Sequence, residues 1–321
     1  MLRRGFWRYS APVLPFKLIY HDGYDLNLGA HVFPSQKYRL IYQALLAEKL
    51  AEPADFLQPQ PACDEDVLLV HSGDWVHKLK AGKLTIPELM RMEIPYSKEM
   101  VAAAWLAAGG SILAGRRALE DGWCANIGGG LHHAYRDHGE GFCPLNDVAI
   151  AIRRLQADGA IEKAMVVDTD VHQGNGTAAI FGGDGDVFTL SIHQENNYPY
   201  PKPPSTLDVN LPDGTGDEDY LAILERHLIL AFNMFSPQLL FHVAGADPYS
   251  DDQLGGLSLT LEGLRRRDAL VYEQSRRHGV PVAIALAGGY ARRLFDTVRI
   301  HVQTILAARD EALKQKHAIG A

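Results

Sequence analysis

The sequence predicts an α/β fold of three layers, in which helices cover both faces of a central, mainly parallel sheet. Short apolar runs rich in β-branched residues recur along the chain, and longer segments with helical patterning separate them. No internal repeat, low-complexity tract or long linker interrupts this alternation. We therefore expect residues 1–321 to form a single domain.

Six apolar runs are candidate strands, and a seventh run is a weaker candidate. The six are residues 17–21, 67–71, 164–168, 187–193, 239–244 and 281–287, and the weaker one is 124–127. Short, nearly continuous apolar runs of this kind are typical of strands that are buried on both faces of a parallel sheet.

Helices are expected between these strands. They fall at about 36–50, 98–120, 147–158, 217–235, 258–278 and 292–314. The Ala-rich run 101–108 predicts a helix packed closely in the core, and the Pro-rich segment 199–204 predicts a stiff surface loop. The three consecutive arginines Arg265, Arg266 and Arg267 predict a solvated helix face.

Composition restricts the kinds of partner. A formal net charge of -8 argues against nucleic acid, because phosphate binding requires clustered Lys and Arg. No segment has the roughly 18 unbroken apolar residues that a membrane span needs. The three cysteines Cys63, Cys124 and Cys143 have no paired spacing, which predicts free thiols and a reducing, cytoplasmic location.

Polar side chains follow four of the predicted strands. In an open parallel sheet, ligands bind outside the carboxyl ends of the strands. The side chains that would meet there are His132 and His133 after 124–127, Asp168, Asp170 and His172 after 164–168, Asp247 after 239–244, and Tyr290 after 281–287. The sequence thus predicts a functional site at this edge of the sheet.

Asp170, His172 and Asp247 are enough protein ligands for a catalytic metal ion with open positions. Alternate residues of an extended segment face the same way, so Asp170 and His172 can reach one ion. Zinc suits this mixed nitrogen and oxygen set, and ferrous iron suits it too. In the alternative interpretation, Asp168 and Asp170 merely cap a following helix.

The adjacent histidines His132 and His133 follow three glycines. A buried pair of imidazoles is costly unless both rings are hydrogen-bonded. A single histidine is more often a satisfied core residue than a catalyst, whereas a pair that follows a Gly-rich turn leaves both interpretations open.

Six motifs in order resemble the histone deacetylase superfamily, which includes bacterial deacetylase-like and acetylpolyamine amidohydrolases. They are GGGLHH at 128–133, GFCPLND at 141–147, DTDVHQGNG at 168–176, AGADP at 244–248, LSLTLEG at 257–263 and AGGY at 287–290. The variant HQGNG, with Gln173 and Asn175, is similar to class IV deacetylases and their bacterial relatives. The resemblance implies the arginase-deacetylase type of three-layer fold.

The resemblance also implies a mechanism. Asp170, His172 and Asp247 would bind zinc, and water activated by the ion would attack the amide carbonyl. His133 would be the general base, and His132 would carry positive charge or help to protonate the leaving amine. Tyr290 would donate a hydrogen bond to the carbonyl oxygen as that oxygen becomes anionic.

Further residues take supporting roles by the same resemblance. Asp168 would orient His132, and Asn175 stands behind His133 where other classes carry a second Asp. The substrate tunnel would be formed by Phe142 on one wall, Tyr198 on the other, the Gly141 carbonyl and, at the acyl end, Cys143. A potassium ion would bind near the zinc at Asp168, Asp170, His172 and Ser191.

The function predicted from these residues is zinc-dependent hydrolysis of an N-acyl-lysine amide. Two alternatives stay open: hydrolysis of an acetylpolyamine or another small amide, and a catalytically silent module that binds acyl-lysine.

Rival interpretations of the same residues as a different kind of site are weaker. Two features argue against a dinucleotide-binding site at 174–179. The glycines begin six residues after Asp168, which is too far from the strand, and the carboxylates at the strand end would repel a pyrophosphate. An aspartyl phosphatase would have a small or β-branched residue where this chain has His172. A binuclear arginase-like site would need further acidic ligands and a D-A-H-x-D type of spacing, which the chain lacks.

Overall fold

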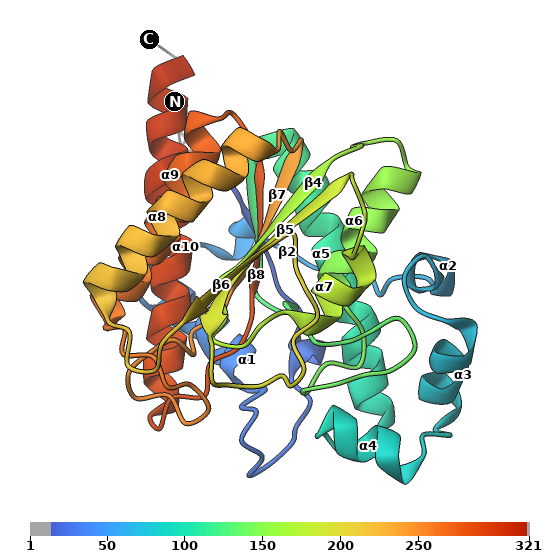
Figure 1. The fold of residues 1–321 in the computed structure, drawn as a ribbon. Coiled ribbons are helices and arrows are strands. Elements are labelled where there is room, and N and C mark those ends of the chain that lie inside the picture. The colour runs from blue at the N-terminus through green and yellow to red at the C-terminus, as the bar shows by residue number, and fades with distance from the viewer. Residues whose placement is uncertain (1–13, 320–321) are drawn as a thin grey trace, which may run out of the picture.

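The structure, a computed structural model, describes residues 14–319 and contains one sheet of eight strands (Figure 1). The strand order is β2-β1-β3-β8-β7-β4-β5-β6, and every neighbouring pair is parallel. The strands are β1 Lys17–Ile19, β2 Phe56–Leu57, β3 Trp123–Asn126, β4 Ala164–Asp168, β5 Val187–Gln194, β6 Leu207–Leu211, β7 Leu239–Ala244 and β8 Val282–Leu286.

Helices cover both faces of this sheet (Figure 1). One layer contains α1 Lys37–Ala47, α8 Asp217–Met234, α9 Leu261–Arg277 and α10 Leu294–Ile319. The other contains α5 Lys98–Asp121, α6 Asp147–Ala157 and α7 Asn175–Phe181. The shorter helices α2 Asp64–Leu68, α3 Gly73–Ala81 and α4 Ile86–Met92 lie beside α5 (Figure 1). The predicted three-layer α/β architecture is confirmed, and the sheet is wholly parallel.

Two apolar cores lie on opposite faces of the sheet, because successive strand side chains point to opposite sides. On β4, Met165 and Val167 belong to the core under α8, α9 and α10. Ala164 and Val166 on the same strand belong to the core under α5 and α6. Burial on both faces explains why these strands are nearly continuous apolar runs.

The long helix α5 packs closely against its neighbours through small residues. Most of the Ala-rich run 101–108 is buried, as the sequence predicts. A Cβ at Gly109 would collide with the backbone of Gln60, and one at Gly115 would crowd Leu155 and Phe241. Ser97 begins the helix by accepting a hydrogen bond from the amide of Met100.

One predicted strand is wrong. Residues 67–71 lie at the end of α2 and in the turn after it. Val67 and Val70 are buried whereas Leu68 and Leu69 are exposed, which is a helical pattern and not a strand pattern. Asp64, Glu65 and Asp66 provide the acidic first turn that favours a helix start.

Two strands were not predicted. The edge strand β2 has only two residues and therefore no sequence pattern. The opposite edge strand, β6, alternates polar and apolar residues (LDVNL) because one of its faces is more exposed.

Other predictions concern the chain as a whole. Cys63, Cys124 and Cys143 are free, as expected. Among residues 14–319, no helix combines the length and the hydropathy that a membrane crossing requires.

Candidate active site

Four adjacent strands, β3, β8, β7 and β4, deliver the predicted polar residues to one edge of the sheet. Because all four strands are parallel, their carboxyl ends lie at the same edge. Asp170 and His172 follow β4, Asp247 follows β7, and Tyr290 follows β8. The histidine pair follows β3 after the glycines 128–130. The structure therefore brings these residues together as the sequence predicts.

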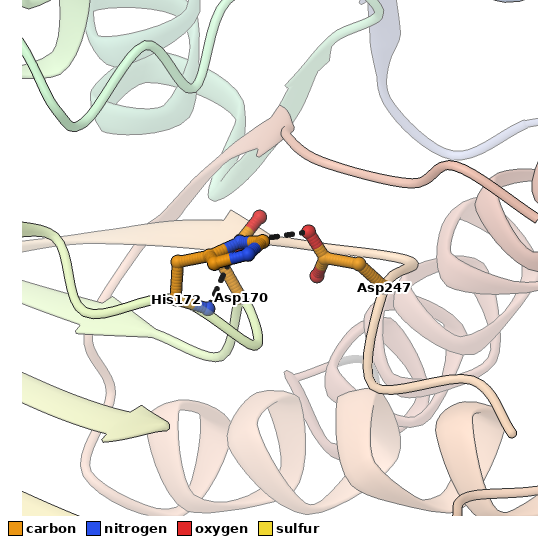
Figure 2. A group of neighbouring side chains, drawn as sticks. All are labelled: Asp170, His172 and Asp247. Carbon is orange, nitrogen blue, oxygen red and sulfur yellow. Dashed lines mark hydrogen bonds and ion pairs between the residues drawn. The ribbon is translucent and has the colours of Figure 1, made fainter. Parts of the chain in front are cut away.

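Asp170, His172 and Asp247 form a buried group whose potential ligand atoms all lie within 4.8 Å of one another. Nδ1 of His172 lies 3.1 Å from Oδ1 of Asp170 and 3.6 Å from Oδ2 of Asp247. Figure 2 shows the imidazole turned toward the Asp247 carboxylate. Three converging buried donors with mixed nitrogen and oxygen atoms fit a divalent cation with open positions.

Backbone amides hold the two carboxylates in place. Oδ2 of Asp170 accepts a hydrogen bond from the amide of Gly288 at 3.0 Å, and Oδ1 of Asp247 accepts one from Val171 at 2.9 Å. Among residues 14–319, Oδ2 of Asp247 has no hydrogen-bond partner, although it is buried. Burial raises the pKa of Asp247, and the charge of Asp170 raises it further. A cation at this point would satisfy the free oxygen and relieve the repulsion.

Glycines keep the space around these carboxylates open. A Cβ at Gly288 would collide with Oδ2 of both Asp170 and Asp247, and a Cβ at Gly245 would also crowd both side chains. The first glycine of the pair in AGGY, Gly288, and the glycine in AGADP, Gly245, are therefore required by close packing against the ligands.

His132 is paired with a carboxylate. Its Nδ1 lies 2.6 Å from Oδ2 of Asp168, and both side chains are buried. Burial alone lowers the pKa of His132, but Asp168 and Asp170 outweigh it and raise the pKa to about 9. The ring is therefore positively charged at neutral pH.

His133 has a neutral partner instead. Its Nδ1 lies 2.6 Å from Oδ1 of Asn175 at the start of α7. Burial lowers the pKa of His133 well below the ordinary histidine value, and the neighbouring His132 and His172 lower it further. The two adjacent histidines thus differ in charge, because one has a carboxylate behind it and the other an amide.

The turn before the histidines depends on a residue that had no predicted role, Asp147. Gly129 and Gly130 have φ angles of 89° and 74°, which non-glycine residues rarely adopt. The buried Asp147 carboxylate accepts hydrogen bonds from the amides of Gly130 and Leu131 and from the hydroxyl of Ser111. Asp147 is part of the motif GFCPLND, but only the fold shows that its carboxylate holds the glycine turn before the histidines.

Tyr290 lines a cavity of about 440 Å³ that His172 of the carboxylate group also lines. The cavity is lined by His31, Val32, Glu93, His133, Gly141, Phe142, His172, Asn197, Tyr198, Leu254 and Tyr290. The amide of Tyr290 donates to Oδ2 of Asp252 at 2.6 Å, which fixes the loop after β8. Burial raises the pKa of Tyr290 well above the ordinary tyrosine value, so the phenol stays protonated.

The two predicted tunnel aromatics both line this cavity. The ring of Tyr198 packs edge-on against His133 at 5.0 Å. The ring of Phe142 lies 5.8 Å from that of Tyr290, and its residue has a φ of 68°. A non-glycine residue with positive φ is held there by its surroundings: the amide of Phe142 donates to the carbonyl of Met92 at the end of α4.

Cys143 does not line the cavity among the residues that the structure describes. Its side chain is buried, and its Sγ lies 3.3 Å from the carbonyl oxygen of Gly141. The expected place of Cys143 at the acyl end of the tunnel is therefore not seen, because the side chain turns toward Gly141. The Gly141 carbonyl, which was expected to line the substrate tunnel, accepts this hydrogen bond from the Cys143 thiol.

The residues expected to bind potassium lie together behind the carboxylates. Asp168 and Ser191 are register partners on β4 and β5, and both side chains are buried. The amide of Asp170 donates to Oδ1 of Asp168 at 3.1 Å, and the hydroxyl of Ser191 lies 2.9 Å from Nδ1 of His193. This proximity is compatible with a cation site, which stays a prediction.

Arg267 corrects the prediction that all three consecutive arginines are solvated. Arg266 is exposed, but Arg267 is fully buried and pairs with Asp268. Its Nη1 donates to the carbonyl of Gly245 at 2.6 Å and to that of Thr169 at 3.2 Å. One guanidinium therefore joins the two loops that carry Asp170 and Asp247.

Comparisons with known proteins agree with this geometry. The family model of the histone deacetylase domain matches residues 31–306. An uncharacterised protein of Picosynechococcus sp. is 42% identical over 296 residues, which are 92% of this chain and 99% of that protein. Histone deacetylase 2 of Arabidopsis thaliana is 29% identical over 329 residues, with 94% of this chain and 83% of that protein covered.

The solved structures show the same fold. That of an HDAC homolog from Aquifex aeolicus has a TM-score of 0.78 and 23% identity, and the match covers 94% of this chain and 88% of that one. The family model matches most of the chain, and the matched residues include the described site. The chain therefore belongs to the histone deacetylase family.

Proposed function

We propose that this protein hydrolyses the amide bond of N-acylated lysine with the help of a zinc ion held by Asp170, His172 and Asp247. Family membership supports a hydrolase of the deacetylase type. The observation that carries the proposal is the group of three buried donors, one of which, His172, lines the same cavity as His133 and Tyr290. A bound zinc ion would supply Lewis acidity toward the acyl carbonyl and the attacking water.

His133 is suited to take the proton of the attacking water. Its Nδ1 is engaged by Asn175, so Nε2 is the ring nitrogen that is left for the cavity. A general base must be neutral before it acts, and the lowered pKa keeps His133 neutral at physiological pH. The new C–O bond forms as the proton moves to this nitrogen.

His132 and Tyr290 would stabilise the opposite charges. The Tyr290 hydroxyl, protonated because its pKa is raised, can donate to the carbonyl oxygen as negative charge develops there. The positively charged His132 lies next to His133, with ring centroids 4.0 Å apart, and can help to deliver a proton to the leaving amine. Cleavage of the C–N bond then yields the free amine and a carboxylate.

The cavity walls support an acylated aliphatic amine as substrate. Phe142 and Tyr198 offer apolar faces to a chain of methylene groups, and the Gly141 carbonyl lies on the same lining. Glu93 adds a carboxylate to this lining, which would attract the positive charge of a free amine elsewhere on the substrate. For that reason an acylated polyamine is a second candidate substrate. Asp168, Asp170, His172 and Ser191 would hold potassium as a structural ion.

The first experiment is a substrate panel of peptides that carry lysine with acyl groups from acetyl to myristoyl, with N-acetylputrescine beside them. Each reaction would be run with zinc, with a chelator, and with the Tyr290→Phe variant. We expect zinc-dependent release of the acyl group and a loss of about 10²–10³ in kcat for Tyr290→Phe. Tyr249→Phe, which removes a hydroxyl outside the cavity lining, should retain activity.

Two results would refute the proposal in different ways. No release from any substrate by a protein that binds zinc tightly would exclude the deacylase function and favour a binding role. Release that persists in Tyr290→Phe at the full rate would show that another group stabilises the carbonyl oxygen.

A further inference from the structure

Glu140 connects Tyr198, which lines the cavity, to Asn175, the partner of His133, through one carboxylate oxygen. Its Oε1 accepts a hydrogen bond from the hydroxyl of Tyr198 at 2.6 Å and from Nδ2 of Asn175 at 2.8 Å. Its Oε2 lies 3.3 Å from Nε2 of His138. The Glu140 side chain is only 17% exposed, and no motif or expected role singled it out.

The ionised carboxylate of Glu140 can only accept hydrogen bonds. Burial raises the pKa of Glu140, but the hydrogen bonds from His138, Tyr198 and Asn175 outweigh this and lower it below the ordinary value. The group is therefore ionised at neutral pH. As a pure acceptor, it requires Asn175 to present its NH₂ group and not its carbonyl oxygen.

The orientation of Asn175 determines which nitrogen of His133 carries the hydrogen. With its NH₂ group on Glu140, Asn175 turns Oδ1 toward Nδ1 of His133, 2.6 Å away. Because Oδ1 is an acceptor only, Nδ1 must be the donor. In the neutral ring, Nε2 then has a free lone pair.

We propose that Glu140 is a positioning residue that fixes, through the Asn175 amide, the His133 tautomer in which the cavity-facing Nε2 is unprotonated. The consequence for catalysis rests on the proposed function, in which His133 accepts a proton. The tautomer itself does not depend on that function.

The backbone around Glu140 holds its carboxylate in register with Asn175. The amide of Glu140 donates to the carbonyl of Cys143, and the amide of Cys143 donates back to the carbonyl of Glu140. The next residue, Gly141, donates to the carbonyl of Arg91. Because this loop also carries Phe142, one rigid segment positions both a cavity wall and the acceptor behind Asn175.

Glu140 also explains why residue 175 is an asparagine in this chain. An aspartate there would face the Glu140 carboxylate at the distance now bridged by a 2.8 Å hydrogen bond. Two carboxylates this close repel each other, and neither can donate. Glu140 and Asn175 are thus a matched pair. The negative charge is on Glu140, and the Asn175 amide separates it from His133, whereas an aspartate at position 175 would place the charge directly beside the ring.

The test exchanges the carboxylate at position 140 with the amide at position 175. The single variant Asn175→Asp should reduce kcat/KM at least about tenfold, because it places two acceptors opposite each other. The double variant Glu140→Gln with Asn175→Asp restores one donor, since a glutamine NH₂ in the place of Oε1 can donate to the new aspartate and to the hydroxyl oxygen of Tyr198, while the glutamine oxygen faces His138. We expect the double variant to recover most of the activity that Asn175→Asp loses, and Glu140→Gln is measured alone to complete the double-mutant cycle.

A second variant removes the acceptor completely. Glu140→Met preserves length but leaves Asn175 free to turn over, so we expect a loss of at least about tenfold in kcat and little change in KM. Glu195→Met is the matched control, because Glu195 is an exposed glutamate with no side-chain contact to Asn175. Melting temperatures of all variants separate an unfolded protein from a folded one with a misplaced base.

The direct readout is the ¹⁵N NMR spectrum of His133 in the zinc-loaded protein. The wild type should show a protonated Nδ1 and an unprotonated Nε2, and Glu140→Met should show a mixture of tautomers. An Nε2–H tautomer in the wild type, or an unchanged spectrum and activity in Glu140→Met, would overturn the proposal. If no acyl substrate is turned over, the proposed function fails, but the NMR result still decides the role of Glu140.

Discussion

Single residues around the carboxylates define the proposed metal site as strongly as the ligands do. Gly288 donates its amide to Asp170, and its missing Cβ leaves the space that both carboxylates fill. The sequence showed the glycine pair before Tyr290, but only the fold reveals that the first glycine lies against the ligands. The position therefore accepts no side chain.

Gly288→Ala is expected to weaken zinc binding by about 10–100-fold, because the new methyl group displaces the carboxylates of Asp170 and Asp247. Competition with a chromogenic chelator measures this affinity. Gly185→Ala is the control, since a Cβ at Gly185 meets nothing within 4 Å. Equal zinc affinity in the wild type and Gly288→Ala would show that the ligands do not occupy the position seen in the structure.

His71 makes the stability of the protein depend on pH. Its Nε2 accepts a hydrogen bond from the amide of Asn146, the residue that caps α6. Burial lowers the pKa of His71 to about 4 from the ordinary value of 6.5. The unfolded chain therefore binds a proton more readily than the native state between these two pH values.

We expect the free energy of unfolding to fall as pH decreases from about 6.5 to about 4, with His71 contributing about 3 kcal/mol to the total loss. Urea denaturation across this range measures the slope. His71→Gln retains an acceptor that does not titrate, so its slope should be smaller. The control His77→Gln changes an exposed histidine and should keep the wild-type slope.

Helix α9 reaches the proposed metal site through Arg267. Its side chain lies on the same helix face as Leu264 and Val271, which are buried. The sequence shows this shared face, because Leu264, Arg267 and Val271 are spaced three and four residues apart. The run of three consecutive arginines instead suggested a solvated face. The position of a residue on the helix therefore predicts its burial better than its charge does, when another element supplies a buried hydrogen-bond acceptor. Here that acceptor is the Gly245 carbonyl.

Arg267→Met should lower the free energy of unfolding by about 3–5 kcal/mol, because Asp268 would remain buried without its partner. Arg266→Met is the control on the neighbouring position: it removes an exposed ion pair with Glu218 that contributes at most about 1 kcal/mol. Chemical denaturation compares the two variants. A similar small effect for both would mean that the buried pair is not required for folding.

At the scale of the whole molecule, the sequence predicted the central strands better than the edges. The bounds of β4 and β7 were predicted fully, because strands buried on both faces consist of apolar residues throughout. The edge strands β2 and β6 have shorter or alternating patterns that local reasoning does not separate from loops. The proposed metal ligands and Tyr290 were predictable because each lies just after a strand, whereas the contact between Glu140 and Asn175 joins residues 35 apart and exists only in the fold.

Removal of the proposed metal ion should destabilise the whole protein. An ion that binds only the native state contributes about 2.7 kcal/mol when its free concentration is one hundred times Kd. We therefore expect dialysis against a chelator to lower Tm and zinc to restore it. Asp247→Asn, which removes one ligand charge, should lose this response, and a zinc-dependent rise in Tm that persists in Asp247→Asn would place the ion elsewhere.

The position of β8 in the sheet has a consequence for synthesis. This strand comes last in the chain but lies between β3 and β7 in the sheet. Until it emerges from the ribosome, the nascent chain can form only two separate half-sheets, each with an unpaired apolar edge. A ribosome stalled before residue 282 would therefore hold a chain that exposes two aggregation-prone edges, and such a chain would depend on chaperones until the closing strand arrives.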